Sequence, residues 1–549
     1  MVRRQALLLF IYIVYLVLLG NDWIYSGEIW AESSTDFYRN SKLNFFDALF
    51  IPHSGYLAFP QRIISFFLGI FDFDPGIVAH VYNWSGILLG ALLVSVINLN
   101  YFRCLIKSDH IRWLLSLSIL LLAGFSERQF INFTYLGAFF VLSYALLAFY
   151  LKNHNIFPKL SMFIPFIMAS KPAVLALMPI LFLSFFFAKN IKFKTTLFIG
   201  LIFGFLQFFV LLNSYLEGVF VPVSNYTILE KLVSAILYWL FYLEGSIFGK
   251  VAQHYVFSID YARLIFYSFF SIIVFKNKNH IFFLFSESKH LLLLLFFSAL
   301  SYSIFNSFAI SDFWNLEIYN NFRSIDVNRY SLFLIGIFFF AISLIFDKAS
   351  KKYKINSHIY FLLWITFSGW ILYFVYKDIS NNGNGKFPYT NVSYWQKANE
   401  RGIINTTCIP VNPLGWVYGD ECINLEPTVY QPNPYLFEDL QSIKWIKDNN
   451  SFHIDNLITG FGIVISNKER KDIEIHAYIR FEKNEELKLS QSIKKEDPNP
   501  ALIYFWLPIP VKYKSIIDIE VGLPKGIDVA IFSKDGNQSS FVINAIKYD

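Results

Sequence analysis

The first two-thirds of the chain consists of long apolar blocks separated by short polar breaks. The apolar positions fill these blocks instead of recurring at a helical or strand period, which is typical of helices surrounded by lipid. The hydrocarbon core of a bilayer is about 30 Å thick and needs roughly 20 apolar residues per helix. About eleven stretches suit this length, and the predicted membrane-spanning helices cover residues 5–20, 77–99, 112–126, 133–151, 158–169, 172–188, 195–213, 262–275, 290–310, 330–347 and 358–376.

Two parts of this pattern leave alternatives open. The stretches 158–169 and 172–188 are short and are separated by Lys171-Pro172. A single long helix here would reverse the orientation of every later segment. Within residues 214–261 an apolar run is flanked by charges, which favours an outer amphipathic or re-entrant segment over a span.

From about residue 455 the apolar period changes to two, as in strands with one buried face. Turn residues such as Pro498-Asn499-Pro500 separate the apolar runs. About seven short antiparallel strands predict a β-sandwich. The predicted strands cover residues 462–466, 473–481, 486–492, 501–507, 516–521, 528–533 and 540–546. The predicted fold class is therefore a membrane all-α polytopic bundle of about 11 transmembrane helices with a C-terminal extracytoplasmic β-sandwich domain.

The pattern divides the chain into three parts. Residues 1–377 form the predicted transmembrane domain, in which residues 21–76 make a large first outer loop. Residues 378–454 form a Trp- and Pro-rich connector, and residues 455–549 form the β-sandwich accessory domain. The connector aromatics could stack on sugar rings, but packing of the sandwich onto the membrane part is the favoured interpretation. These aromatics are Trp395, Trp416, Tyr418 and Trp445.

The composition excludes an ordinary soluble enzyme. Of 549 residues, 55% are hydrophobic and only 16% are charged, whereas globular chains carry about 25% charged residues. The formal net charge of +6 divides at residue 378 into 28 Lys+Arg against 18 Asp+Glu before it, and 18 against 22 after it. A basic membrane part thus precedes a mildly acidic, water-soluble part. No Lys/Arg run with interleaved aromatics suggests nucleic acid as a partner.

The positive charges predict the orientation, because cytoplasmic loops accumulate Lys and Arg. Most basic residues of the membrane part fall in one set of short loops when the N-terminus is placed in the cytoplasm. An odd number of spans then carries residues 378–549 to the outside. The basic start is followed by an apolar stretch without a small-x-small cleavage pattern, so residues 5–20 are interpreted as a retained first helix.

The three cysteines agree with this orientation. Cys104 lies at a predicted cytoplasmic helix end, where a free thiol is ordinary. Cys408 and Cys422 lie in the exported tail, where an oxidising compartment would allow a disulfide between them. Two buried thiols are the alternative.

Two acidic residues in the first outer loop are candidates for catalysis. Glu32 and Asp36 are four residues apart, so on a helix their carboxylates share one face. A carboxylate pair can polarise an acceptor hydroxyl as a general base, or it can hold a divalent cation through oxygen ligands. The alternative is the solvated face of an interfacial helix. No metal and no cofactor is assigned, and a divalent cation stays an alternative.

Further polar residues on the predicted outer face are candidates for binding a donor phosphate or substrate. Gly55 permits unusual backbone angles, so that the neighbouring His53 and Arg62 could be displayed at the membrane surface. Arg suits bidentate phosphate contacts, although a lone interfacial Arg is usually a snorkelling anchor. The predicted binding residues are His53, Tyr56, Arg62, Glu127, Asn132, Lys171, Arg323 and Arg329.

Together these features resemble the polytopic GT-C glycosyltransferases, which use polyprenyl-phosphate-linked sugars. The arrangement of a basic N-terminus, one span and a long acidic outer loop carries the resemblance across residues 5–376. The stretch His-Ser-Gly-Tyr-Leu-Ala-Phe-Pro-Gln-Arg is similar to a G-Y-L-x-x-x-P-R-type segment of uncharacterised bacterial members, with Gln61 inserted before Arg62. Glu127 with Asn132 is similar to a Glu-plus-Asn segment of those proteins.

The resemblance implies a multi-pass protein of a bacterial inner membrane that transfers a sugar to an envelope glycan or lipid acceptor. Arg62, Lys171 or Arg329 would hold the phosphate of the lipid donor. Asp36, in preference to Glu32, would orient or deprotonate the acceptor hydroxyl for inverting attack. The partners implied are the lipid bilayer, a polyprenyl-phosphate-linked sugar and the glycan or lipid acceptor.

Two other functions fit the same sequence. A polymerase or flippase of lipid-linked oligosaccharides would handle similar molecules, but a flippase usually needs polar residues along the whole bundle, whereas here the charges cluster at one face. A non-enzymatic membrane anchor could present the β-sandwich as a glycan-binding module. An anchor needs only one span, which argues against this second alternative.

Overall fold

The fold is known from a computed structural model. The residues that it describes are 2–18, 27–30, 32–123, 128–217, 227–233, 235, 278–309, 332–353, 389–390, 394–400, 404, 409–411, 416–418, 422–424, 436–446, 457–482, 485–493, 501–512, 515–534, 537–539 and 541–546.

The chain divides into two compact units, and each combines segments that are distant in sequence. The first unit consists of Met1–Leu16, Leu43–Phe67 and Ser85–Lys377. The second consists of Val17–Lys42, Leu68–Trp84 and Asp378–Asp549. The predicted first outer loop is therefore shared. Its middle belongs with the helices, whereas its two ends belong with the C-terminal part.

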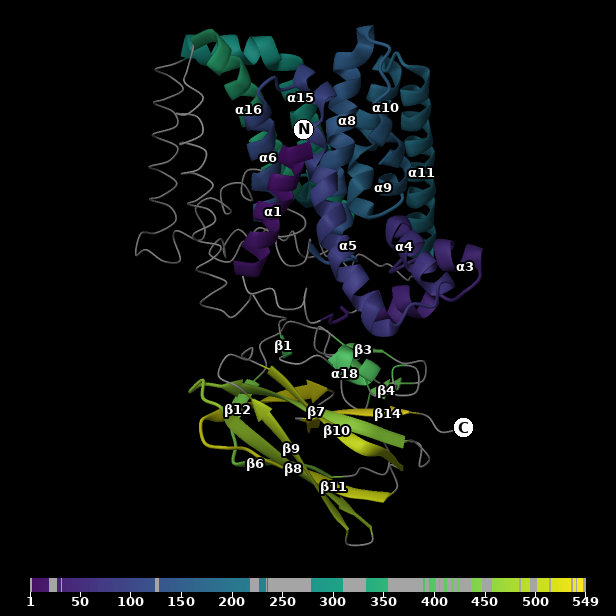
Figure 1. The fold of residues 1–549 in the computed structure, drawn as a ribbon, viewed down its shortest axis with the longest axis vertical. Helices are drawn as coiled ribbons and strands as arrows, with labels where there is room; N and C mark the ends of the chain where they lie inside the picture. The colour runs from purple at the N-terminus through teal and green to yellow at the C-terminus, as the bar shows by residue number, and fades with distance from the viewer. Residues whose placement is uncertain are drawn as a thin grey trace. The chain divides into compact units, whose positions relative to one another are not determined.

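The N-terminal part of the chain is helical, and several of its helices are long and apolar (Figure 1). Its named helices are α1 (Val2–Leu18), α3 (Phe45–Phe50), α4 (Phe59–Ile70), α5 (Pro75–Ser95), α6 (Asp109–Leu122), α8 (Gly137–Tyr150), α9 (Ile164–Met168), α10 (Met178–Phe187), α11 (Ile191–Leu216), α15 (Lys278–Ala309) and α16 (Leu332–Tyr353).

Four helical stretches among the described residues are long and apolar enough to cross a membrane. They are Pro75–Asn98, Phe133–Asn153, Ile191–Leu216 and Lys289–Asn306. Shorter apolar helices cover Gln5–Val17, Phe59–Ile70, Lys159–Met168 and Pro172–Phe187. The predicted spans 262–275 and 358–376 lie outside the described residues. The described part of the chain is thus largely helical, and four of its helical stretches could cross a membrane.

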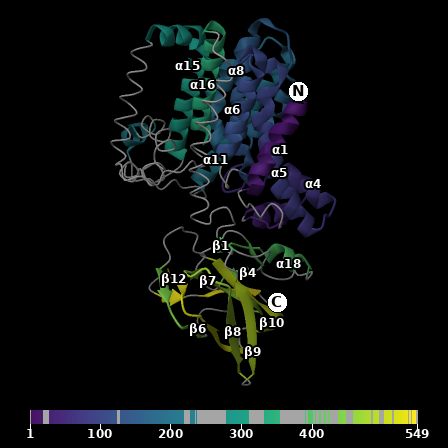
Figure 2. The same cartoon turned by 60° about the vertical axis from the view of Figure 1, so that its left-hand side comes forward.

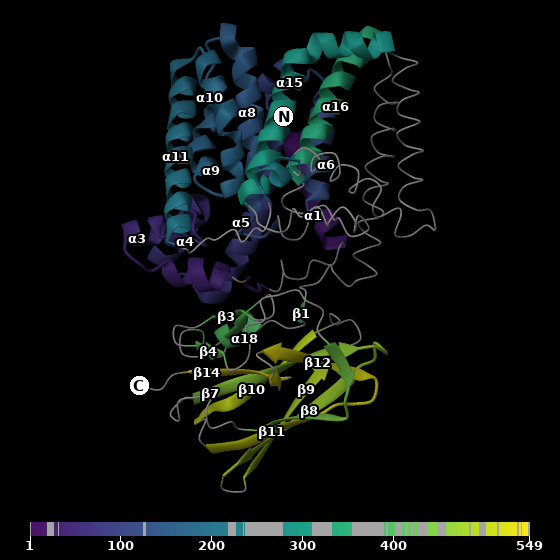
Figure 3. The same ribbon diagram turned by 180° about the vertical axis from the view of Figure 1, so that it is seen from behind.

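Helix α8 lies at the centre of the first unit. Every residue from Gly137 to Ala148 is buried, because the helix is apolar on all sides and can therefore be surrounded by other helices. It contacts α9, α10, α15 and α16, and α15 and α16 pack side by side (Figures 2 and 3). In contrast, α11 exposes large apolar side chains such as Phe205 and Phe209, as a helix facing lipid would.

The chain reverses direction between α9 and α10. Two glycines one turn apart on α11 show this, because each contacts one residue of α9 and one of α10. The neighbours are Ile164 and Leu181 at Gly200, and Met168 and Met178 at Gly204. From Gly200 to Gly204 the contacted residue on α9 therefore has a higher number, whereas the contacted residue on α10 has a lower one. The two helices form an antiparallel hairpin, as the sequence predicts from the break at Lys171-Pro172, and not one continuous helix.

The C-terminal part forms two main β-sheets. Each predicted strand beyond residue 455 has a counterpart, and these are β7 (Leu457–Asn467), β8 (Ile473–Phe481), β9 (Glu486–Ile493), β10 (Ala501–Lys512), β11 (Ile516–Gly522), β12 (Ile527–Lys534) and β14 (Phe541–Ile546). The four-stranded sheet has the order β6-β11-β8-β9, with β6 at Ser442–Ile446. The larger sheet follows the order β1-β10-β7-β12-β13, with β1 at Tyr389–Thr390 and β13 at Asn537–Ser539, and β14 also pairs with β7.

The two sheets share one hydrophobic core. In β8 the buried residues Ile475, Ala477 and Ile479 alternate with polar residues that point the other way, because successive side chains of a strand face opposite sides. Phe461 of β7 and Phe505 of β10 stack from the larger sheet, with ring centroids 5.1 Å apart, and they belong to the same core cluster.

Residues 378–454, predicted as a connector, contain regular structure of their own. This region contributes β5 (Leu436–Asp439) and β6 to the two sheets, where they pair with β12 and β11. Its other elements are β1 (Tyr389–Thr390), α18 (Tyr394–Glu400), β2 (Ile409–Val411), β3 (Trp416–Tyr418) and β4 (Cys422–Asn424). These strands are too short for a period of two to be recognised in the sequence.

We expect Gly86→Ala to destabilise the first unit. A Cβ at Gly86 of α5 would lie 2.5 Å from the backbone oxygen of Arg128, and backbone atoms cannot move aside as a side chain can. Such overpacking costs about 1–3 kcal/mol. Heating the purified protein in detergent and measuring the monodisperse fraction would show a lower midpoint. Gly90→Ala, one turn away, meets only a leucine methyl at 2.9 Å and should change the midpoint less; equal midpoints would contradict the expectation.

Candidate functional site

A buried lysine lies where the α9–α10 hairpin turns. Lys171 is 4% exposed, and its Nζ donates a hydrogen bond to Tyr56 Oη at 2.5 Å. The same ammonium lies 4.8 Å from the ring centroid of Tyr56 and 5.5 Å from that of Tyr135, within the range of cation–π attraction. Ionisable groups inside a membrane protein are costly, and they default to functional candidates. Lys171 is the strongest such candidate in the first unit.

The tyrosine that meets Lys171 is presented by a tight turn of the first outer loop. His53 and Tyr56 exchange backbone hydrogen bonds, with His53 N to Tyr56 O at 2.7 Å and Tyr56 N to His53 O at 3.0 Å. Ser54 and Gly55 between them both have positive φ, 46° and 82°, as a type I′ turn requires. The His53 ring packs edge-on against Tyr56, with centroids 5.1 Å apart. The predicted residues His53, Tyr56 and Lys171 thus lie together.

Two buried glutamines hold this turn and the hairpin in place. Gln207 of α11 accepts from Leu57 N at 2.9 Å and donates to Leu57 O at 3.3 Å and Ser170 O at 3.2 Å. Gln61 donates to the carbonyls of Phe130 and Ile131. The sequence alone does not single out Gln207, although a single amide in an otherwise apolar span could have indicated a buried polar contact. Gln61, first noted only as an insertion, links the first loop to the next predicted outer segment.

The other predicted binding residues are distributed as follows. Arg62 on α4 is buried, as is Asn132 before the 3₁₀ turn Phe133–Tyr135. The neighbouring Arg128 lies over the ring of Tyr15 at 5.4 Å. Glu127, Arg323 and Arg329 lie outside the described residues, so their predicted roles stay predictions.

The two candidate carboxylates belong to the second unit, where they lie on an unusual helix. Glu32 directly precedes the π-helix η1 (Ser33–Tyr38), which contains Asp36. Both side chains are partly exposed, and Asn40 Nδ2 donates to Asp36 Oδ1 at 2.8 Å. A π-helix is rare and is found frequently at functional sites. Both carboxylates are therefore partly accessible to solvent, and that of Asp36 is held by a neighbouring amide.

A cluster of three buried aromatic rings lies at the end of this π-helix. Tyr38, Trp395 of α18 and Tyr418 of β3 have mutual ring-centroid distances of 5.2 to 5.6 Å. Burial, with the nearby carboxylates of Asp72 and Asp74 contributing, raises the pKa of Tyr38 to about 12. This phenol therefore stays protonated at neutral pH. Trp395 and Tyr418 are packing residues and do not offer a face to a sugar.

Three further acidic residues of the second unit were not singled out from the sequence. Glu28 is buried, and its Oε2 accepts from the backbone N of Trp395 at 3.3 Å. Asp74 accepts from Gly76 N at 2.9 Å and so caps the start of α5. Asp72 pairs with Lys42 at 2.6 Å. The Asp72-Phe73-Asp74 spacing was a visible signal, whereas nothing local distinguishes Glu28.

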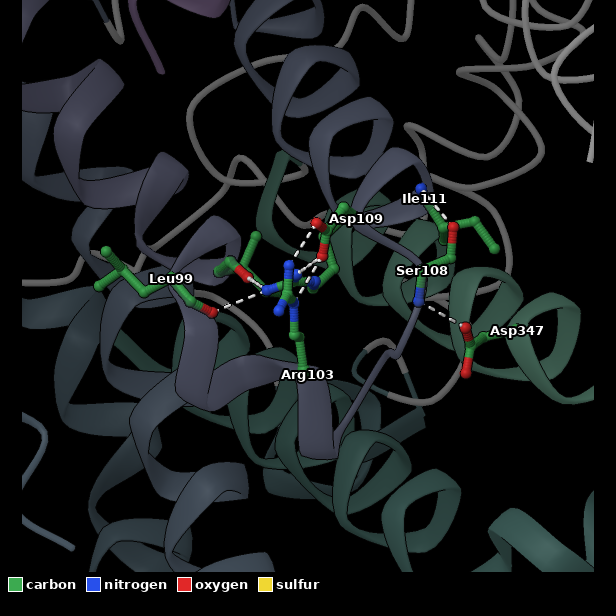
Figure 4. Close-up of polar contacts among 8 residues, drawn as sticks. Leu99, Arg103, Ser108, Asp109, Ile111 and Asp347 are labelled. Carbon is green, nitrogen blue, oxygen red and sulfur yellow. Dashed lines mark hydrogen bonds and ion pairs between the residues drawn. The ribbon is translucent and has the colours of Figure 1, made fainter. Parts of the chain in front are cut away.

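A second charged cluster in the first unit has a structural role (Figure 4). Asp109 accepts from Arg103 Nε at 2.9 Å and Nη2 at 2.6 Å, and it also pairs with the buried Arg112. Arg112 Nη1 in turn donates to the carbonyls of Ile97 and Leu99. Asp347 of α16 accepts from Ser108 N at 2.8 Å. These bonds satisfy polar groups near the start of α6, and they connect that region to α16 and to the residues that follow α5.

The cysteines and the possible metal ligands bear on the predicted disulfide and on a metal site. The side chains of Cys408 and Cys422 are outside the described residues, so the predicted disulfide stays a prediction. Cys104 is a free thiol that donates to Tyr101 O at 3.0 Å, and burial raises its pKa to about 11. Within the described part of the chain, no three His, Cys, Asp or Glu side chains are grouped so that they could hold a metal ion.

Comparison of the chain with protein-family models, with curated proteins and with solved structures found no match.

We expect Asp109→Asn to destabilise the first unit strongly. The substitution removes the carboxylate between two guanidinium groups and leaves Arg112, whose side chain is 1% exposed, without its charged partner. Removing one member of a buried ion pair costs about 3–5 kcal/mol. Asp72→Asn is the matched control, because the side chains of Lys42 and Asp72 are 55% and 77% exposed and such pairs contribute about 0–1 kcal/mol. Thermal unfolding of both variants tests this contrast, and equal midpoints would contradict it.

Proposed function

We propose that the protein is an integral membrane glycosyltransferase of the GT-C type, which moves a sugar from a polyprenyl-phosphate donor to an envelope glycan or lipid acceptor. The observation that carries this proposal is the buried Lys171 ammonium, hydrogen-bonded to Tyr56 at the turn of the α9–α10 hairpin. A lipid-linked phosphate is an anion that reaches its enzyme from within the membrane. A cation between apolar helices suits that ligand.

The depth of Lys171 agrees with a lipid-borne donor. Gln207, which bonds to Ser170 next to Lys171, lies sixteen residues after Ile191 at the start of α11. At a rise of about 1.5 Å per residue, this separation is roughly 24 Å along the helix. With the basic residues 189–194 in the cytoplasm, Lys171 would lie in the outer part of a bilayer about 30 Å thick. A donor phosphate in the outer leaflet has a similar depth.

The proposed mechanism gives each group one task. Lys171 holds the donor phosphate and offsets the negative charge that develops on it as the bond to the sugar breaks. Tyr56 orients the Lys171 ammonium through its hydroxyl. Asp36, assisted by Glu32, takes the proton of the acceptor hydroxyl as its oxygen attacks the anomeric carbon from the opposite side. The products are the inverted glycoside and the lipid phosphate. Arg62, Arg323 and Arg329 are further candidates for phosphate contacts.

A divalent cation stays an alternative partner of Glu32 and Asp36, whose carboxylates could hold it through oxygen ligands. The steps above are derived from the side chains.

The full proposal includes the topology predicted by the sequence. It places the N-terminus in the cytoplasm of a bacterium, about eleven spans in the inner membrane, and the two β-sheets outside. The second unit supports this arrangement, because it combines both ends of the first outer loop with the C-terminal part. Loops and strands that pack together in this unit belong on one side of the membrane in the proposed topology.

Lys171→Met is expected to abolish transfer. The substitution keeps the length and apolar stem of the side chain but removes the charge, and loss of one such stabilising group lowers rates by about 100-fold or more. Cells that carry only the variant should lose the glycan that a gene deletion removes, as measured by mass spectrometry of surface glycans. Lys171→Arg should retain part of the activity, and Lys152→Met, at an exposed position, should retain all of it.

The binding step can be measured separately with the purified protein in nanodiscs. Lys171→Met should bind undecaprenyl phosphate more weakly than the unchanged protein, whereas Asp36→Asn should bind it normally and fail only in transfer. Normal glycan in cells with Lys171→Met, at normal protein level, would refute the phosphate role of Lys171. If both Asp36→Asn and Glu32→Gln preserve the glycan, the carboxylate mechanism is wrong, and a flippase or a glycan-binding anchor becomes the better interpretation.

A reporter that is active only outside the cytoplasm should be active when fused after Asp549. The same reporter fused after Lys192, in a predicted cytoplasmic segment, should be inactive, because the basic residues around it are retained inside. Enzyme activity in intact cells, normalised to protein level, gives the result. The opposite pattern would overturn the proposed topology and the predicted disulfide together.

A further inference from the structure

Helix α18, from the region that the sequence predicts as a connector, packs into the segment that carries the candidate carboxylates. Trp395 is fully buried and contacts three parts of the first outer loop. Its backbone N donates to Glu28 Oε2 at 3.3 Å, its indole Nε1 donates to Pro75 O at 2.9 Å, and its ring meets Tyr38 edge-on with centroids 5.3 Å apart. Trp395 thus joins three separate parts of this loop, two through its side chain and one through its backbone.

The rest of α18 adds polar contacts to the same segment. Gln396 Nε2 donates to Gly27 O at 2.9 Å and to Gly76 O at 3.2 Å, and Asn399 Nδ2 donates to Asp74 Oδ1 at 2.9 Å. The fit leaves no spare room, because a Cβ at Gly27 would lie 2.3 Å from Gln396 Nε2. Gly27 also has a φ of +67°, which favours glycine. The two segments therefore meet in one specific arrangement.

The conformation of the carboxylate segment, residues 32–38, depends on its contact with α18. Asp36 and Tyr38 share the π-helix η1, whose i→i+5 pattern is uncommon and persists where the surroundings impose it. Tyr38 ends that helix and has its ring against both Trp395 and Tyr418. Anchoring the ring of Tyr38 fixes the helical register, and that register decides where the Asp36 carboxylate points.

We propose that Trp395 is a positioning residue for the carboxylate of Asp36, so that the C-terminal part of the chain is required for the transfer step itself. This inference rests on the proposed function, in which Asp36 activates the acceptor. It assigns the C-terminal part a different role from that of an accessory domain. A misplacement of about 1 Å by a change away from the reacting atoms can lower a rate about 100-fold, so loss of the Trp395 ring should be nearly as damaging as loss of Asp36.

The test compares two substitutions at one position with a control elsewhere in the same unit. Trp395→Ala removes the ring, Trp395→Phe keeps an aromatic ring against Tyr38 but loses the bond to Pro75, and Trp506→Ala removes a tryptophan of β10 that packs on Tyr504. Each is made in the full-length protein, and thermal unfolding confirms that it folds. Surface glycan in cells lacking the original gene reports transfer.

A spectroscopic reading reports the position of the carboxylate segment independently of transfer. Arg39→Cys, at an exposed site just after the π-helix, carries a nitroxide in a background with Cys104→Ala, Cys408→Ser and Cys422→Ser. Its electron paramagnetic resonance spectrum is recorded in nanodiscs. Trp395→Ala should convert the immobilised spectrum into a mobile one and reduce surface glycan about 100-fold. Trp395→Phe should restore an immobilised spectrum and most of the glycan, and Trp506→Ala should leave the spectrum unchanged.

Three results would overturn the inference. An immobilised spectrum with Trp395→Ala would show that the ring does not hold the segment. A mobile spectrum with normal glycan, while Asp36→Asn abolishes it, would show that transfer does not need this positioning; the proposed function would stand. Normal glycan with both Asp36→Asn and Glu32→Gln would overturn the proposed function and the inference together, even if the spectrum responds to Trp395→Ala.

Discussion

Polar groups buried between the helices of the first unit are shielded from solvent, and this constraint shapes the candidate site. A buried donor or acceptor without a hydrogen bond costs free energy, so a buried amide is stabilised by partners inside the protein. Gln207 has such partners at both ends of its amide, on the first outer loop and on the hairpin turn. The resulting cross-links bring Tyr56 and Lys171 together although they are 115 residues apart. Without these bonds, apolar packing alone would leave the hairpin and the loop free to slide.

The charged groups around Asp109 and the ammonium of Lys171 differ in their partners, and this difference distinguishes a structural role from a proposed chemical one. Asp109 has two arginines around it, and Arg112 has two backbone carbonyls as well. Opposite charges and hydrogen bonds there neutralise each other, which is what a structural tie requires. Lys171 donates to the Tyr56 hydroxyl and lies over the rings of Tyr56 and Tyr135. In the proposed mechanism its positive charge attracts the donor phosphate, whereas the charges around Asp109 pair with one another within the protein.

The second unit links regions that the sequence separates into different domains. The first outer loop contributes the π-helix with Asp36, and the C-terminal part contributes α18 and β3, which contact it through Trp395 and Tyr418. Residues 436–446 add strands to the same sheets as residues 457–546. A division into membrane domain, connector and sandwich therefore describes the order of segments along the chain better than the way in which they pack.

The sequence by itself determined the features that depend on local periodicity. A period of two is set by the strand backbone, and the seven strands that it predicts, β7 to β12 and β14, are present. The break at Lys171-Pro172 likewise predicts the reversal between α9 and α10, because proline and a charge both interrupt an apolar helix. Residues 218–226 and 236–277 lie outside the described part of the chain, so the predicted outer segment within 214–261 stays a prediction.

Only the tertiary structure decided which side chains act together. Glu28 and Trp395 are 367 residues apart, and Leu57 and Gln207 are 150 apart; no local pattern marks such pairs, because their selection depends on how helices and loops pack. The sequence chose Lys171, Tyr56 and Asp36 from their chemistry and their breaks in apolar runs. It could not show that the Tyr56 hydroxyl oxygen accepts a hydrogen bond from Lys171, or that Asp36 lies on a π-helix whose last residue packs against a distant tryptophan. Those facts follow from packing, which fixes position, whereas periodicity fixes only the type of element.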